Sequence, residues 1–273
     1  MGIIRPLNKI SPNDIARFGG KAASLGALSN IKGILVPSGF AIGVEATALN
    51  LRKFEKDITD RFHSLKTRHV AVRSSATAED AAEASFAGQF DTFLNVTKGN
   101  LIKYIRKCYG SINSDKVRNY IRSKEMSRGS INIAIVVQKM IQSEISGVAF
   151  SVNPVSGNKN EIIVEAAYGL GEYIVSGVVT PDKYIFNKKS LELKDRKINY
   201  QKHRLALGTN ENKKEEVPLV YRNAQKLKKR YFSPLLKNII EIERRYKTPM
   251  DIEWAIADKR IYITQARPIT TLI

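Results

Sequence analysis

Short β-like runs spread along the chain constrain its fold more than any other feature of the sequence. They include HVAVR, INIAIVVQKM, GVAFSV, EIIVEAAYG and the closing stretch DIEWAIADKRIYITQARPI. Runs of this length, rich in Val and Ile and bounded by turn residues, favour strands. Between them, KAASLGALSNI and residues 100–123 have the spacing of helices. Because strands and helices mix throughout, the predicted class is α+β, with α/β as the alternative.

Length and cysteine content limit the architecture. With 273 residues the chain is long enough for one large domain or two smaller lobes. Its single cysteine, Cys108, excludes an intrachain disulfide and a Cys-rich zinc site, and we expect a buried structural thiol rather than a nucleophile. No apolar run approaches the roughly 20 residues that span a bilayer, and the first residues lack a signal-peptide core. We therefore expect a cytoplasmic protein.

The charge is strongly basic. Lys and Arg number 45 against 26 Asp and Glu, which gives +19. This raises the hypothesis of a nucleic-acid-binding protein. Much of the excess, however, lies between residues 187 and 247 in runs that also contain acids, as expected of solvated surfaces. Nucleic acid is therefore an unlikely partner, and this reading is kept as an alternative.

Two segments have the residues of a phosphate site. In GGKAASLG, a pair of glycines precedes Lys21 at the beginning of a helix, where backbone amides and the helix dipole favour an anion. In VAVRSSATAED, Arg73 ends a strand and enters a long loop of small residues, and its guanidinium suits phosphate oxygens. The alternatives are an exposed lysine after a glycine break, and pairing of Arg73 with acids of its own loop, Glu79, Asp80 and Glu83.

The strand VVQKMI ends in polar Gln138 and flexible Met140. Adenine needs a flat apolar surface together with backbone hydrogen bonds, and methionine suits such surfaces. The segment could therefore form an adenine slot, whereas taken alone Met140 is more typical of a core.

The two closing strands contain an oxygen-rich set. Asp251 and Glu253 are two residues apart and share one strand face, as do Gln265 and Arg267 on the next strand. Carboxylate and amide oxygens suit Mg²⁺ that bridges ATP phosphates. The alternative is a surface ion pair between Asp251 and Arg267.

A shared metal requires a particular strand register. A two-residue turn at Asp258-Lys259 would pair Glu253 with Thr264 and turn Gln265 to the other face. A three-residue loop would set Glu253 opposite Gln265. We therefore predict a loop of odd length, although no glycine is present to ease one.

Several motifs together resemble one known family. GGKAASLG, VPSGFAI, VAVRSSATAED, ASFAGQFDTFLNV, GVAFSVNPV, AAYGLGE, VSGVVTPD and DIEWA…ITQARPIT occur in that family's order. The sequence resembles the N-terminal ATP-binding domain of phosphoenolpyruvate synthase, pyruvate phosphate dikinase and rifampin phosphotransferase over residues 8–271. The resemblance implies an ATP-grasp fold, in which two lobes enclose a nucleotide cleft, with ATP and Mg²⁺ as cofactors.

The resemblance also implies roles for single residues. Lys21, Arg73 and Arg267 match phosphate-binding residues and are the predicted catalytic groups. Gly88 and Thr92 match further nucleotide contacts, and Gln138, Met140 and Ile141 match the adenine side. Glu253 and Gln265 match the Mg²⁺-ATP ligands, and Asp251 is their predicted helper.

In the family, a swivelling domain with a phospho-accepting histidine follows this region. Here the chain ends soon after QARPIT, and none of its three histidines, His63, His69 and His203, lies in an acceptor motif. We expect neither a swivelling histidine domain nor a pyruvate-binding barrel in this chain. The predicted function is phosphoryl transfer from Mg-ATP to a histidine on a partner or missing domain, as in phosphoenolpyruvate synthase. The alternatives are a non-catalytic regulatory nucleotide-binding module and a basic nucleic-acid binder.

Overall fold

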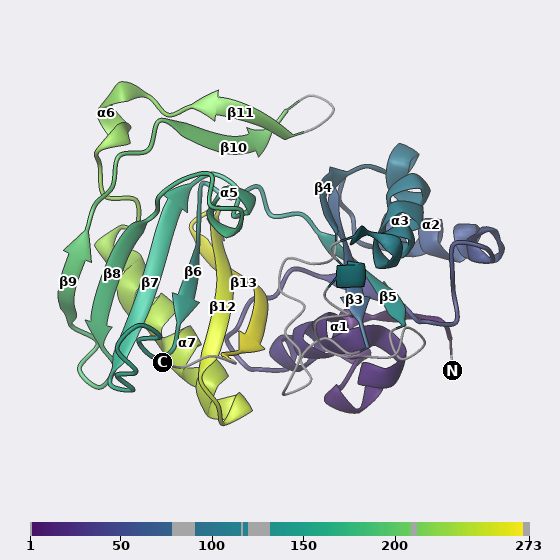
Figure 1. Ribbon diagram of the computed structural model, residues 1–273, viewed down its shortest axis with the longest axis horizontal. Helices are drawn as coiled ribbons and strands as arrows, with labels where there is room; N and C mark the ends of the chain where they lie inside the picture. Colours follow the sequence, from purple (N-terminus) through teal and green to yellow (C-terminus); the bar gives the residue numbers. More distant parts are fainter. Residues whose placement is uncertain (1, 78–90, 116, 120–131, 209–211, 270–273) are drawn as a thin grey trace. The chain divides into compact units, whose positions relative to one another are not determined.

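The chain forms two compact α+β units (Figure 1). The computed structural model describes residues 2–77, 91–115, 117–119, 132–208 and 212–269. The first unit comprises residues 1–30 and 37–140, and the second comprises residues 31–36 and 141–273. Each unit contains its own sheet and its own helices, which confirms the predicted α+β class.

The first unit is built on an antiparallel sheet in the order β1-β2-β5-β3-β4. Its strands are β1 (Ile4–Pro6), β2 (Gly39–Ile42), β3 (Val70–Ala76), β4 (Thr92–Val96) and β5 (Ile133–Lys139). Its helices are α1 (Ile15–Ser29), α2 (Glu55–Ser64) and α3 (Leu101–Gly110), with short 3-10 turns at Leu7–Lys9, Pro12–Asp14, Leu51–Phe54, Lys98–Asn100 and Ser111–Asn113.

Both faces of this sheet are covered. Alternate residues of β5 and β3 pack with α2 and α3 in one apolar cluster, which includes Ile135, Val72, Phe62 and Ile105. Helix α1 contacts β3 and β5 from the other side (Figure 1). The strands that read as continuous apolar runs in the sequence are therefore buried on both faces, as such runs predict.

The second unit is built on an antiparallel sheet in the order β13-β12-β6-β7-β8-β9. Its strands are β6 (Ile145–Phe150), β7 (Glu161–Tyr168), β8 (Asp182–Asn187), β9 (Leu193–Lys197), β12 (Met250–Ala257) and β13 (Arg260–Pro268). A separate hairpin of β10 (His203–Leu207) and β11 (Asn212–Glu216) lies beyond one end of β7 (Figure 1). The helical segments are α5 (Glu172–Val175), α6 (Leu219–Arg222), α7 (Phe232–Tyr246) and a 3-10 turn at Lys229–Tyr231.

Helix α7 covers one face of the six-stranded sheet. Its first residue, Phe232, lies with its ring centroid 5.8 Å from that of Tyr184 and 5.0 Å from that of Phe186. Tyr184 lies in the cross-strand row that runs through Ile252 to Ala266. Because residues opposite each other in a ladder share a face, this row marks the α7 face of the sheet. The neighbouring row belongs to the other face.

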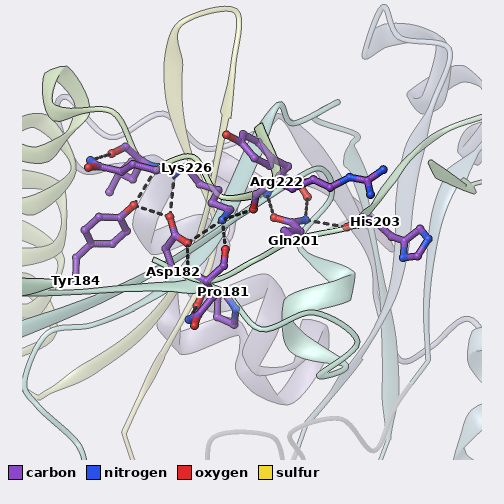
Figure 2. Close-up of polar contacts among 11 residues, drawn as sticks. Pro181, Asp182, Tyr184, Gln201, His203, Arg222 and Lys226 are labelled. Carbon is purple, nitrogen blue, oxygen red and sulfur yellow. Dashed lines mark hydrogen bonds and ion pairs between the residues drawn. The ribbon is translucent and has the colours of Figure 1, made fainter. Parts of the chain in front are cut away.

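A buried ion pair anchors the segment that carries the β10–β11 hairpin (Figure 2). Lys226 Nζ lies 3.0 Å from Asp182 Oδ1, and both side chains are fully buried. The same carboxylate accepts hydrogen bonds from the Tyr184 hydroxyl and from the backbone N–H groups of Asn199 and Lys226, each at 2.9 Å. Both oxygens of the carboxylate are thus bonded, to Tyr184 on β8 and to Asn199 and Lys226, which flank the hairpin segment of residues 200–225.

Gln201 makes a second anchor for the segment that carries the β10–β11 hairpin (Figure 2). Its side-chain oxygen accepts from the Tyr168 N–H at 2.9 Å, and its amide donates to the Tyr168 carbonyl at 3.0 Å and to the His203 carbonyl at 2.9 Å. A side-chain amide that pairs with both backbone groups of Tyr168 replaces the missing neighbour strand at the end of β7. The hairpin is therefore fixed to the sheet through polar contacts at its base.

We predict that Lys226→Met lowers the free energy of unfolding by about 3–5 kcal/mol, because it leaves the Asp182 carboxylate buried without its cation. Urea unfolding followed by circular dichroism measures the change. Arg244→Met is the control, since Arg244 pairs with Glu241 on the exposed face of α7 and such pairs contribute little. Equal losses in the two variants would contradict the role of the buried pair.

Candidate functional site

Helix α1 is kinked just before Lys21. Gly19 has φ 76° and ψ 167°, a conformation that only glycine adopts readily. A Cβ at this position would come within 2.3 Å of Ser75 Oγ and 2.4 Å of the Ser75 carbonyl oxygen. The kink therefore presses α1 against β3, and Lys21 Nζ donates a hydrogen bond to the Ser74 carbonyl at 3.2 Å. This confirms that the glycine pair breaks the helix in front of Lys21.

Arg73 and Thr92 lie on the sheet face that α1 covers. They are directly opposite each other on β3 and β4, so their side chains share a face. Ser75, two residues beyond Arg73 and therefore on the same face, contacts α1 through its hydroxyl. Lys21, Arg73 and Thr92 thus belong to one face of the first unit. Gly88 and the acids proposed as alternative partners of Arg73 lie outside the described residues.

The predicted adenine segment lies where the chain passes from the first unit to the second, between Met140 and Ile141. Gln138 is opposite Ala71 on β3 and is buried, and its side-chain amide donates to the Pro37 carbonyl at 3.3 Å. The Met140 N–H donates to the His69 carbonyl at 3.1 Å. Met140 and Ile141 are half-buried, and their contact with adenine stays a prediction.

The hairpin of β12 and β13 has a turn of other length than predicted, but it has the predicted facing pairs of residues. Ala257 pairs with Arg260, so the turn has two residues, Asp258 and Lys259, with φ of 50° and 60°. The prediction of an odd-length loop was wrong, because these two residues adopt the left-handed conformation of a tight hairpin turn without any glycine.

A β-bulge restores the register that the site needs. It lies between Glu253 and Trp254 on β12, and Thr264 is the extra residue on β13. Beyond the bulge, Glu253 pairs with Gln265 and Asp251 pairs with Arg267. The facing pairs that a shared metal requires are therefore present.

Asp251 and Arg267 form the ion pair that the sequence left open. Arg267 Nε donates to Asp251 Oδ2 at 2.8 Å, and a terminal guanidinium nitrogen lies 2.7 Å from the same oxygen. Burial raises the pKa of the Asp251 carboxyl, the Arg267 guanidinium opposes this rise, and the nearby Glu253 adds to it. The carboxylates of Asp251 and Glu253 therefore lie close enough to interact electrostatically.

Gln265 provides the most informative atom of the cluster. The side chain is 8% exposed, and its Oε1 is buried without a hydrogen-bond partner among the described residues. Leaving a buried amide oxygen unsatisfied costs about 1–3 kcal/mol, which a bound cation would remove. Glu253 is the cross-strand partner of Gln265, so the two side chains share one face of the sheet. An amide oxygen and a carboxylate are ligands that suit Mg²⁺.

The part of the chain that is described contains no cluster of three or more His, Cys, Asp or Glu side chains able to hold a metal. Mg²⁺ is commonly held by one or two carboxylates together with substrate phosphates rather than by a protein cage. The donor set at Glu253 and Gln265 therefore fits the metal that the sequence predicted.

Sequence reasoning missed two charged residues on the same sheet face. A single cross-strand row runs from Lys183 through Glu165, Val148 and Glu253 to Gln265. Burial raises the pKa of Glu165, the Lys183 ammonium opposes this rise, and Asp251 adds to it. The acid inside the apolar run EIIVEAAY was the available signal, because a charged residue in such a strand needs a polar face.

Two further expectations concern the rest of the chain. Cys108 is fully buried, and burial raises the pKa of its thiol to about 12, which confirms a structural rather than a nucleophilic cysteine. Within the described ranges, we find no helix with the length and apolar character needed to cross a bilayer.

Comparison with known proteins gives consistent matches. Residues 48–273 match the family described as the AMP/ATP-binding domain of pyruvate phosphate dikinase. A probable phosphoenolpyruvate synthase of Methanocaldococcus jannaschii is 46% identical over 74% of this chain and 17% of its own length. One from Archaeoglobus fulgidus is 36% identical over 97% of this chain and 41% of its own length. A rifampicin phosphotransferase of Bacillus cereus is 34% identical over 97% of this chain and 35% of its own length.

The chain thus spans less than half the length of these relatives. Among solved structures, a D-alanine–D-alanine ligase of Bacillus anthracis in complex with ATP aligns with a TM-score of 0.41 and 11% identity, over 90% of this chain and 54% of its own. The two α+β units, each with its own sheet, agree with the predicted ATP-grasp fold. On the match to more than half of its residues, the chain belongs to the family of pyruvate phosphate dikinase AMP/ATP-binding domains.

Proposed function

We propose that the chain binds Mg-ATP and acts as the nucleotide-binding part of a phosphotransferase. The observation that carries the proposal is the buried Gln265 Oε1, which lacks a hydrogen-bond partner among the described residues and belongs to the cross-strand partner of Glu253. A bound cation would satisfy this oxygen. The family description names AMP and ATP as the nucleotides, and the oxygen ligands support Mg²⁺ as the counter-ion.

In the first unit, Lys21, Arg73 and Thr92 are the groups proposed to bind the nucleotide. The guanidinium of Arg73 offers a planar set of donors for phosphate oxygens, and the Lys21 ammonium offers a point charge beside the amides that follow the kink. Thr92 is exposed opposite Arg73, so its hydroxyl is available as a further donor. Gly88 and the adenine-side residues Gln138, Met140 and Ile141 complete the proposed set.

In the second unit, Glu253 and Gln265 are the proposed metal ligands. Arg267 binds phosphate in this proposal, and Asp251 holds the arginine in place through their ion pair. When bound, Mg²⁺ would neutralise charge on the phosphate oxygens, which is the main requirement of phosphoryl transfer. In this proposal the residues of the chain hold the triphosphate in one orientation. Phosphoryl transfer depends mainly on such positioning and on charge neutralisation, and little on covalent catalysis by the protein.

The phosphate acceptor is proposed from the relatives. Their names, phosphoenolpyruvate synthase and rifampicin phosphotransferase, differ in the final substrate, so we leave pyruvate and other small molecules as options. We propose transfer to a histidine on a partner or on a further domain, because none of the three histidines of this chain lies in an acceptor motif. Gene fusion or co-purification with a histidine-containing domain would support this step.

Lys21→Ala and Arg73→Ala should each reduce the rise in melting temperature that Mg-ATP produces. A ligand that binds only the folded state stabilises it by about 2.7 kcal/mol at a concentration one hundred times its Kd. Differential scanning fluorimetry across an ATP titration gives the apparent Kd. Lys237→Ala is the control, because Lys237 is exposed on α7 and outside the proposed site. A wild-type protein that shows no shift at millimolar Mg-ATP would contradict the proposed function.

Glu253→Gln and Gln265→Ala should each raise the Mg²⁺ concentration needed for ATP binding about tenfold or more, since the first removes the charge of one proposed ligand and the second removes the other ligand. The measurement is an Mg²⁺ titration at fixed ATP, read by isothermal calorimetry. Glu161→Gln is a matched control, because Glu161 belongs to the same sheet but pairs with Lys194 and Asn153. If all three variants keep the wild-type Mg²⁺ dependence, the metal assignment is wrong.

A further inference from the structure

We infer that Ser75 is a positioning residue for nucleotide binding, which holds Lys21 in place through the kink of α1. The inference rests on the proposed function, since it assumes that Lys21 binds ATP phosphates. Ser75 itself is fully buried on β3 and does not touch the nucleotide in this proposal. Its hydroxyl acts on the backbone that carries Lys21.

The Ser75 hydroxyl occupies the place of a helix hydrogen bond. Its Oγ donates to the Phe18 carbonyl at 2.9 Å and accepts from the Ala22 N–H at 3.3 Å. In an uninterrupted α-helix, the N–H of residue 22 would donate directly to the carbonyl of residue 18. The hydroxyl therefore stands between the two groups that would otherwise bond to each other, and such an insertion is a known cause of sharp kinks.

Gly19 makes this insertion possible. Its left-handed backbone opens the turn between Phe18 and Ala22, and a Cβ there would collide with both the hydroxyl and the carbonyl oxygen of Ser75. The glycine and the serine therefore depend on each other. Neither feature is explained by packing of α1 alone, because an unbroken helix would satisfy its own backbone groups without help from β3.

Lys21 lies inside the segment that Ser75 spans. Its backbone is held between Phe18 and Ala22, and its ammonium donates to the carbonyl of Ser74, the residue that precedes Ser75. Arg73 is the next residue back along the same strand. The two proposed phosphate-binding cations are thus tied to one another through three hydrogen bonds, and removal of the Ser75 hydroxyl would let the helix straighten and carry Lys21 away.

Ser74 provides a matched control. It is fully buried on the same strand, but its hydroxyl lies on the opposite face, where it donates to the Cys108 carbonyl at 3.3 Å and lies 3.2 Å from Ser111 Oγ. Ser74→Ala keeps the backbone carbonyl that Lys21 uses. Both alanine variants remove one buried hydroxyl, so they should lose similar amounts of stability.

The test compares Mg-ATP affinity, measured by isothermal calorimetry, for the wild-type protein, Ser75→Ala and Ser74→Ala. We expect Ser75→Ala to raise the Kd about tenfold and Ser74→Ala to leave it within about twofold of wild type, with similar losses of melting temperature. The NMR signal of the Ala22 amide should shift only in Ser75→Ala, because its hydrogen-bond acceptor changes from the Ser75 hydroxyl to the Phe18 carbonyl. Equal affinities in the two serine variants would overturn the positioning role and leave the proposed function intact.

A double-mutant cycle with Lys21→Ala separates positioning from general structural damage. If Ser75 acts through Lys21, adding Ser75→Ala to Lys21→Ala should not weaken ATP binding further, although it should still lower the melting temperature. A further loss of about tenfold in the double variant would overturn the inference, since the serine would then act on another part of the site. Absence of ATP binding by the wild-type protein would overturn both this inference and the proposed function.

Discussion

The candidate site depends on the register between β12 and β13, which a single bulge at Thr264 determines. A hairpin with the same two-residue turn and no bulge would pair Glu253 with Thr264. Because a slip of one residue moves every side chain to the other face, Gln265 and Arg267 would then lie on the α7 face of the sheet, with Gln265 opposite Ile252. The bulge is therefore required to set Glu253 opposite Gln265 and Asp251 opposite Arg267.

The first unit uses a similar device in a helix. The Gly19 kink interrupts the backbone ladder of α1, and the Ser75 hydroxyl satisfies the two groups that the interruption releases. In both units, a local irregularity sets the direction of a charged side chain next to regular structure that remains well packed. Bulges and kinks of this kind are frequent at functional sites, because they aim a side chain where a regular element would not.

The sequence correctly predicted those elements whose position in a sheet follows from the pattern of their own side chains. The apolar runs around Val72 and Ile135 became buried central strands, and the spacing of Asp251 with Glu253 correctly placed both on one face. The turn length could not be predicted, since Asp258 and Lys259 adopt left-handed conformations that usually call for glycine or asparagine. Glu165 and the Ser75 hydroxyl were also missed, because their roles depend on cross-strand alignment and on a contact with α1 that spacing along the chain does not encode.

We propose that Glu253 and Gln265 hold the metal of a bound metal–nucleotide complex. Paramagnetic relaxation by Mn²⁺, used in place of Mg²⁺ with ATP, tests it most directly, because broadening of amide signals in NMR spectra reports proximity to the ion. We expect the strongest ATP-dependent broadening in the second unit at residues 252–254 and 264–266. Broadening confined to the exposed acids of other elements, such as Glu192 and Asp195, would contradict it.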